Sequence, residues 1–459
     1  MSISKSQSPS LGQFSNTKQE FHRLVDVSTY TKLNQYYQLP QDAGGKRNQH
    51  LPQYIERGGE QSFAPPYQST NSELYLFALK ADLQKLKDLC DQYLNPAHSA
   101  FEYRPIFGCV LLGFHRCEAM TPAQTNLSFA QDGEVVFWIP VWKRPKSGAA
   151  PPAGANPHQL PLLFTPYIFL NSSPALISGR EALGYPKQWG WIDFPKGGNL
   201  EQGGDFKLET LVWQQKRGEN LETVQGERDE LLHISWASGL DWALSWLDSG
   251  WRTLHSSWQW WSETLNPFLA ISPSARSSPA ADSGLFGTAT ETVDAAIADI
   301  TASLMAVMTP EDWDAEYVGQ ANPGKPCPKQ LNALIRSFCQ HSFVNVFLKQ
   351  FRDVRETNHA CYQAIVEAPC TSTQVHQIRL LKKHRLFNIT LKNPQSHPIV
   401  EELGLAPIDP HDPEQSYTLQ ARWLTWLKFD FKLEPGEIIW ESNLGQRSGD
   451  RPVHQPLVL

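Results

Sequence analysis

Residues 176–191 of the chain read LISGREALGYPKQWGW, and the rest of the sequence is interpreted around this stretch. It contains an Arg-Glu pair and then Lys187, which stands between Tyr185-Pro186 and two tryptophans. Burial among aromatic side chains disfavours the ammonium form of a lysine and lowers its pKa. A partly neutral amine can attack a carbonyl carbon and form a Schiff base. The alternative is a Pro-Lys in a surface turn, because most lysines are exposed.

Short strands surround this stretch on both sides. Apolar and aromatic runs predict strands at 73–79, 106–114, 134–142, 161–170, 206–213, 343–351, 360–368, 375–381, 386–391 and 423–433. Outside the tryptophan-rich region the predicted helices are short, at 82–94, 174–183 and 398–403. Many irregularly spaced strands favour a mainly β (α+β) fold, an antiparallel barrel or sandwich, over a doubly wound sheet.

Composition divides the chain into five segments. Residues 1–68 are rich in Ser, Gln, Asn, Gly and Pro, which predicts a disordered extension. The strand-rich parts are 69–216 and 340–442, and a tail follows at 443–459. Between them, residues 217–339 carry tryptophans at helical spacing and predict a helical insert. A membrane-surface helix would carry more Lys and Arg, so we expect packing against the protein's own core or another subunit, and a homo-oligomer.

Charge, cysteines and motifs exclude several classes of function. The net charge of −7 argues against a nucleic-acid partner, because no basic excess exists to neutralise phosphates. The 7 cysteines show no CxxC spacing, which fits reduced thiols in the cytoplasm. There is no signal peptide and no membrane-spanning run, so we expect a cytoplasmic protein. Glycine-rich phosphate loops, zinc-ligand spacings and serine-hydrolase elbows are missing, and we expect neither a metal nor a cofactor.

The lysine stretch belongs to a longer motif. It begins with FTPYIFLN at 164–171 and continues through Gly179-Arg180-Glu181 to Tyr185-Pro186-Lys187. This motif resembles the signature of acetoacetate decarboxylases, and weaker similarity extends over 69–213 and 340–442. The resemblance implies an antiparallel acetoacetate decarboxylase-like β-barrel with short flanking helices. It also implies that Lys187 is the Schiff-base nucleophile.

The resemblance further implies roles for residues around Lys187. Glu134 matches an active-site carboxylate that would relay a proton or orient the imine; the alternative is an exposed charge at the start of a strand. Arg180 and Glu181 match the Gly-Arg-Glu signature, where a buried ion pair beneath the lysine is expected to help place it. Tyr185 completes the aromatic surroundings of the lysine.

The sequence departs from the family's pattern next to the nucleophile. Gln188 stands where the family has a second lysine, so it cannot lower the pKa of Lys187 by charge repulsion. Desolvation by Trp138, Trp189 and Trp191 would have to do so instead.

Two further positions differ. Ser72 stands where the family has an arginine. A second carboxylate, expected in the strand near 106–112, is not evident, and Glu102 is the nearest replacement.

The sequence is compatible with two functions. The first is a cofactor-independent carbon–carbon lyase that uses Lys187 on a 3-oxo or 2-oxo acid, by decarboxylation or by related aldol or dehydration chemistry. The second is a non-catalytic protein on the same fold that binds a small apolar ligand or serves assembly. A lowered pKa of Lys187 would favour the enzyme, and a value near the ordinary 10.4 would favour the binding protein.

Overall fold

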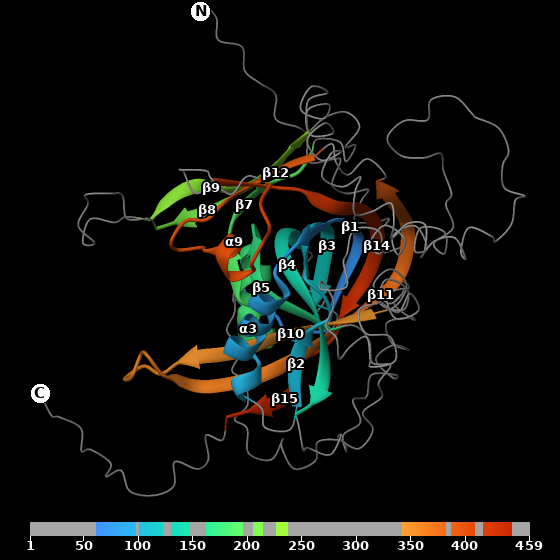
Figure 1. Ribbon diagram of the computed structural model, residues 1–459. Coiled ribbons are helices and arrows are strands. Elements are labelled where there is room, and N and C mark those ends of the chain that lie inside the picture. Colours follow the sequence, from blue (N-terminus) through green and yellow to red (C-terminus); the bar gives the residue numbers. More distant parts are fainter. Residues whose placement is uncertain are drawn as a thin grey trace, which may run out of the picture. The chain divides into compact units, whose positions relative to one another are not determined.

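The structure is a computed structural model that describes residues 61–97, 101–122, 130–146, 162–195, 205–213, 226–236, 342–381, 387–408 and 416–442. All of these residues belong to one compact unit, Gln61–Leu459. Of the extension predicted at 1–68, residues 1–60 lie outside the described residues, but Tyr67 and Gln68 belong to strand β1 and Tyr67 is buried, so the extension ends earlier than predicted. The tryptophan-rich helices and the tail also lie outside the described residues. Within them the chain is mainly β, as the sequence predicts, and the helices are short (Figure 1).

The larger sheet contains β1 (Tyr67–Lys80), β2 (Phe101–Pro105), β3 (Cys109–Pro122), β4 (Ala130–Pro145), β5 (Leu162–Leu170), β6 (Lys187–Trp189), β10 (Ser342–Arg352), β11 (Ala360–Leu381), β14 (Ala421–Leu433) and β15 (Glu437–Glu441). Its strand order is β2-β4-β3-β1-β14-β11-β10-β5-β6, and β15 pairs with β11. Since β4 also pairs with β5, the strands from β4 through β3, β1, β14, β11 and β10 to β5 close into a ring.

The larger sheet is mixed, which corrects the prediction of a purely antiparallel fold. β5 pairs in parallel with β10 and with β6. Parallel neighbours need a crossover connection. Between β5 and β6 that crossover is made by the short helix α4 (Ser173–Ser178) and a π-helical turn, η2 (Gly179–Leu183). The predicted helix at 174–183 is therefore two consecutive helical pieces.

A smaller sheet packs beside the ring. It contains β7 (Trp191–Asp193), β8 (Phe206–Val212), β9 (Glu227–Trp236), β12 (Phe387–Lys392) and β13 (Ser416–Leu419), in the order β13-β12-β9-β8-β7. β9 falls within 217–339, the segment predicted to be a helical insert. Because β9 pairs with both β8 and β12, any insert begins after residue 236.

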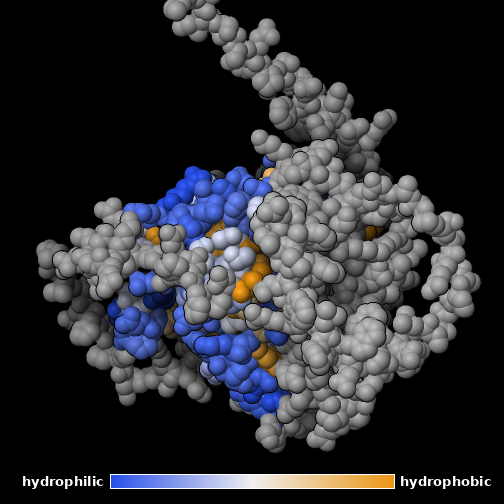
Figure 2. Space-filling view, turned by 45° about the horizontal axis from the view of Figure 1, so that its top comes forward, coloured by the Kyte–Doolittle hydropathy of each residue, from blue (hydrophilic) through white to orange (hydrophobic). Residues whose placement is uncertain are grey.

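The remaining helices are α3 (Leu83–Tyr93), η1 (Asn95–Ala97) and α9 (Ile399–Glu402). α3 confirms the helix predicted at 82–94, and its N-terminus is capped by the Asp82 carboxylate, which accepts from the backbone N–H groups of Gln84 and Lys85. No helix in the described ranges is long and apolar enough to cross a membrane. Among the coloured residues of Figure 2, apolar residues form a narrow band bordered by hydrophilic ones, and a few further apolar spots lie apart from it.

Alternate residues of β1 belong to two different cores, as expected for a strand buried on both faces. Tyr75 and Phe77 contact Phe206 of β8, with ring centroids 4.9 and 5.9 Å apart, so this face packs against the smaller sheet. Leu74 and Leu76 point to the opposite face, toward a second buried cluster inside the ring. That second cluster surrounds the pocket that contains Lys187.

Candidate active site

The crossover between β5 and β6 places the backbone of Lys187. The N–H groups of Gly184 and Tyr185 both donate to the carbonyl of Gly179, at 2.8 and 3.0 Å, and so close the π-helical turn. Gly184 has a φ of 94°, a left-handed conformation that favours glycine. The chain then enters β6, where Lys187 pairs with Ile168 of β5. Lys187 is thus fixed by a strand immediately after a tight turn.

Arg180 lies on the outer side of the same turn and stabilises it. Its guanidinium Nη1 donates to the backbone carbonyl of Lys187 at 2.8 Å. The side chain is exposed, which corrects the expectation that Arg180 and Glu181 form a buried ion pair. The reason is the π-helical turn, which directs Arg180 outward and leaves Glu181 half-buried. Arg180 therefore positions Lys187 through the main chain.

The side chain of Lys187 is enclosed. Lys187 is only 8% exposed, and its Nζ lies 5.1 Å from the centroid of the Tyr185 ring, within range of a cation–π contact. Gly179 leaves the room for this side chain, because a Cβ at Gly179 would lie 2.6 Å from Lys187 Cδ and 3.0 Å from its Nζ. The glycine of the Gly-Arg-Glu signature is needed for this close approach.

Replacing Gly179 by alanine should therefore displace the lysine. We expect activity, and the rate at which an imine at Lys187 is trapped by borohydride, to fall by about 100-fold, because a misplacement of about 1 Å is enough for such a loss. Ala182→Gly, in the same turn, controls for loosening the turn without crowding the lysine. Equal rates in Gly179→Ala and wild type, compared at equal folded fraction, would contradict the packing argument.

Glu134 lies between two cationic groups. Its Oε1 is 3.0 Å from Lys187 Nζ, and its Oε2 is 3.3 Å from Nδ1 of His115. His115 is the direct cross-strand partner of Glu134 in the β3–β4 pair. Nε2 of His115 lies 3.4 Å from the Sγ of Cys117, and all four side chains are largely buried. The alternative interpretation of Glu134 as an exposed strand-end charge is wrong.

This cluster sets the protonation of its members. Burial alone would raise the pKa of Glu134, but the adjacent Lys187 and His115 lower it well below its usual range. Burial alone would lower the pKa of His115, but Cys117 and Glu134 raise it to about 10. Burial would likewise lower the pKa of Lys187, yet the negative charges of Glu134 and Asp132 raise it above its ordinary value.

The raised pKa of Lys187 corrects the expectation that tryptophans lower it. Trp138 lines the pocket, but Trp189 is 38% exposed and Trp191 stacks under the guanidinium of Arg228. Neither Trp189 nor Trp191 is among the described residues that line the cavity. The nearest charge, Glu134, therefore decides the protonation of Lys187.

Asp132 is a second buried carboxylate that sequence reasoning missed. It is 2% exposed, and neither of its oxygens has a hydrogen-bond partner among the described residues. Burial, followed by the charge of Glu134, raises its pKa to about 8. The signal was present in the spacing, since Asp132 and Glu134 are two residues apart and share one face of β4.

Asp132→Asn should stabilise the protein at neutral and alkaline pH. The unfolded chain releases the proton of Asp132 near its ordinary pKa of 3.8, whereas the folded chain keeps it up to about 8, so stability falls as pH rises between these values. At pH 7 we expect the variant to gain about 2–4 kcal/mol in the free energy of unfolding. Chemical denaturation from pH 5 to 8 measures this, with the exposed Asp88→Asn as control. A less stable Asp132→Asn would contradict the prediction.

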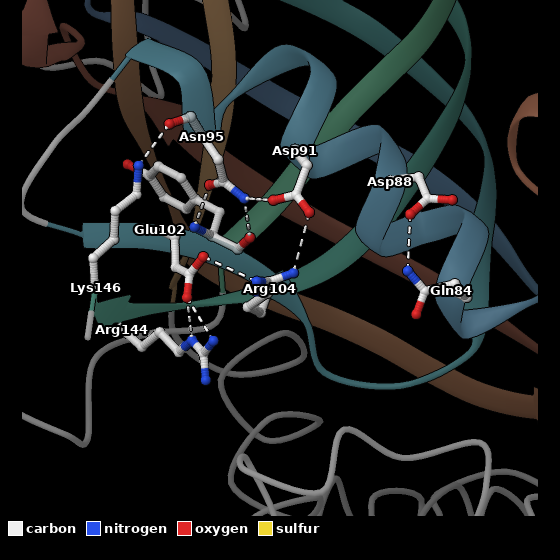
Figure 3. A network of polar contacts seen from close by, with 9 residues as sticks. Gln84, Asp88, Asp91, Asn95, Glu102, Arg104, Arg144 and Lys146 are labelled. Atoms are coloured by element: carbon white, nitrogen blue, oxygen red, sulfur yellow. Dashed lines mark hydrogen bonds and ion pairs between the residues drawn. The ribbon is translucent and has the colours of Figure 1, made fainter.

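The remaining predicted site residues lie elsewhere. Gln188 points to the opposite face of β6 from Lys187, and its Oε1 accepts from Nε2 of His397 at 2.8 Å. Glu102 belongs to a polar network with Arg104 and Arg144, shown in Figure 3, and does not line the pocket. Ser72 is fully buried and its hydroxyl lies 3.7 Å from the Sγ of Cys117. None of these positions supplies the expected second carboxylate, and β3 contributes His115 opposite Glu134 instead.

The pocket itself is a cavity of about 180 Å³. Its polar lining includes Lys187, Glu134, His115, Ser178 and Asn345. The buried Oδ1 of Asn345 has no hydrogen-bond partner among the described residues. Neither an arginine nor a second lysine is among the described residues that line it. In the described ranges no group of three or more His, Cys, Asp or Glu side chains is arranged to hold a metal ion.

The chain was also compared with known proteins. No family model and no curated protein sequence matches it. Solved structures do match, among them acetoacetate decarboxylases and an acetoacetate decarboxylase-like enzyme. Acetoacetate decarboxylase from Legionella pneumophila is 12% identical, with 86% of this chain and 94% of that chain covered and a TM-score of 0.42. The enduracididine biosynthesis enzyme MppR is 11% identical, with 83% and 91% covered and a TM-score of 0.41.

An acetoacetate decarboxylase-like enzyme from Sphingomonas wittichii is 11% identical, with 85% of this chain and 99% of that chain covered and a TM-score of 0.36. Since all three TM-scores lie below 0.5, these similarities assign no reaction to the chain. The function proposed below rests on the side chains of the pocket.

Proposed function

We propose that the chain is a Schiff-base lyase in which Lys187 attacks the carbonyl group of an oxo acid. The observation that carries this proposal is a lysine, 8% exposed, that lines the cavity and whose Nζ lies 3.0 Å from a carboxylate. A lysine amine next to a proton acceptor is the arrangement that imine formation requires.

The proposed reaction begins with a proton transfer between the paired side chains. Lys187 transfers a proton to Glu134, and the free amine attacks the carbonyl carbon. The carbonyl oxygen leaves as water, and a protonated imine forms. In a 3-oxo acid the electrons of the bond to the carboxylate carbon then move toward the imine nitrogen, carbon dioxide leaves and an enamine remains. The enamine carbon takes up a proton, and water cleaves the carbon–nitrogen bond, releasing a ketone and restoring the amine.

The raised pKa of Lys187 has two opposite effects on this sequence. It makes the first proton transfer unfavourable, because the resting state is an ammonium–carboxylate pair. However, the same negative charges stabilise any cation at Nζ, including the protonated imine. Glu134 therefore slows the attack and stabilises its product. His115 holds the carboxylate in place, with Nδ1 3.3 Å from Oε2.

The same raised pKa is the observation that favours the second candidate, a non-catalytic protein whose pocket binds a small ligand. In that case the Lys187–Glu134 pair would only bind the polar end of the ligand. One experiment separates the two. Incubation with 3-oxo and 2-oxo acids and sodium borohydride should leave the reduced substrate skeleton on the peptide that contains Lys187, detected by mass spectrometry. Unlabelled protein across the whole panel would leave only the binding function.

A further inference from the structure

The charged groups of the cavity form one cluster. Lys187, Glu134 and His115 are linked by contacts of 3.0 and 3.3 Å, and Asp132 interacts electrostatically with the first two. The cavity lining offers two basic side chains, Lys187 and His115, and one carboxylate, Glu134. One substrate carboxylate pairs with the basic side chain that Glu134 does not balance, whereas a phosphate or a second carboxylate would be buried without a partner.

The rest of the cavity wall is apolar and largely aromatic. Trp138 packs edge-on against Phe343 with ring centroids 6.0 Å apart, and Phe429 lies 5.6 Å from Phe431. All four side chains line the cavity. Such a wall contributes favourably to the free energy of binding only when apolar ligand surface covers it.

The cavity is also larger than a small oxo acid needs. Its volume of about 180 Å³ exceeds the ~150 Å³ of an engineered apolar cavity that holds benzene. The methyl group of acetoacetate would leave most of the aromatic wall without contact. A ring-sized apolar group would contact it.

We propose that the substrate of Lys187 is a monocarboxylic oxo acid with an aryl or branched alkyl substituent of about the size of a benzene ring. The proposal rests on the Schiff-base function argued above and specifies its substrate class. The carboxylate and the carbonyl lie at the charged cluster, and the substituent lies against the aromatic wall.

Borohydride trapping with two probes tests this substrate class. Acetoacetate and 3-oxo-4-phenylbutanoate have ketones of similar intrinsic reactivity, because the ring of the second is not conjugated with its carbonyl group. We expect 3-oxo-4-phenylbutanoate to label Lys187 half-maximally at a concentration roughly tenfold lower or less, the scale of discrimination that an apolar pocket provides.

Two variants of helix α4 test whether the substituent of the substrate lies in the cavity. Ala175 lines the cavity one turn before Gly179, whereas Ile177 is exposed on the same helix. Ala175→Phe should abolish the preference for the phenyl probe, while Ile177→Phe, which places the same ring on the exposed side of the helix, should keep the preference of the wild type. Equal or better labelling by acetoacetate in the wild type would overturn the substrate class and leave the lyase function standing. If neither probe labels Lys187, the lyase function fails and the substrate class fails with it.

Discussion

Lys187→Met should abolish imine trapping and turnover. Methionine fills a similar volume but has no amine, so neither the nucleophile nor the ammonium–carboxylate pair with Glu134 remains. We expect turnover at the level of the uncatalysed reaction and no mass increment on the peptide that contains residue 187. The measurement is borohydride trapping followed by peptide mass spectrometry, together with the rate of carbon dioxide release from a 3-oxo acid.

A second lysine provides a matched control. Lys349 of β10 is the described lysine whose pKa burial lowers, and it would therefore be the better nucleophile on pKa alone. Its Nζ, however, donates to the carbonyl of Ala182 at 3.0 Å, and it does not line the cavity. Lys349→Met should therefore keep both labelling and turnover. Label found on Lys349, or retained in Lys187→Met, would assign the chemistry to a different lysine.

The sequence predicted the nucleophile's position better than its protonation. Apolar runs located most strands of the ring, and the motif through Lys187 located the turn that places it. The two tryptophans after Lys187 were expected to desolvate it, yet Trp189 is 38% exposed, Trp191 lies against Arg228, and neither lines the cavity. The direction of the pKa shift depends on Glu134, which is 53 residues distant in sequence. Only the pairing of β4 with β5, and of β5 with β6, brings the two together.

His115 and Asp132 were missed in the sequence for the same reason. His115 and Asp132 belong to the site because β3 and β4 pair with His115 opposite Glu134 and Cys117 opposite Asp132. A strand pattern gives the period of two but not the register, and a shift of one residue reverses which side chains face inward. The resemblance implied a second carboxylate in the strand near 106–112, whereas the buried carboxylate that the structure adds, Asp132, lies on the same strand as Glu134. Glu102, the proposed replacement, is held instead by two arginines near helix α3 (Figure 3).

Glu134→Gln should lower the pH at which the imine forms but strongly reduce turnover. Removal of the carboxylate takes away the main charge that raises the pKa of Lys187, so burial prevails and the pKa falls. The pH at which trapping is half-maximal in rate should shift downward relative to wild type. Turnover should nevertheless fall by about 10²–10⁴-fold, because the proton acceptor and the counterion of the protonated imine are both lost.

The same variant changes the dependence of stability on pH. The pKa of Glu134 in the folded protein lies below its ordinary value of 4.5. Its contribution to the free energy of unfolding is therefore fully present above pH 4.5 and is lost as the pH falls below that value. In Glu134→Gln the free energy of unfolding should no longer decrease for this reason below pH 4.5. At neutral pH the free energy of unfolding falls by about 3 kcal/mol, because Lys187 and His115 are left buried without their shared partner.

Glu73→Gln is the matched control for Glu134→Gln. Glu73 is also a largely buried carboxylate, on strand β1, which β3 separates from β4, and it is 2.7 Å from the guanidinium of Arg116. Arg116 is 36% exposed, so water can replace the lost partner and the loss of stability should be smaller. Neither the pH of half-maximal trapping nor turnover should change in this control. An unchanged trapping profile in Glu134→Gln would mean that Glu134 does not govern the protonation of Lys187, whatever its effect on stability.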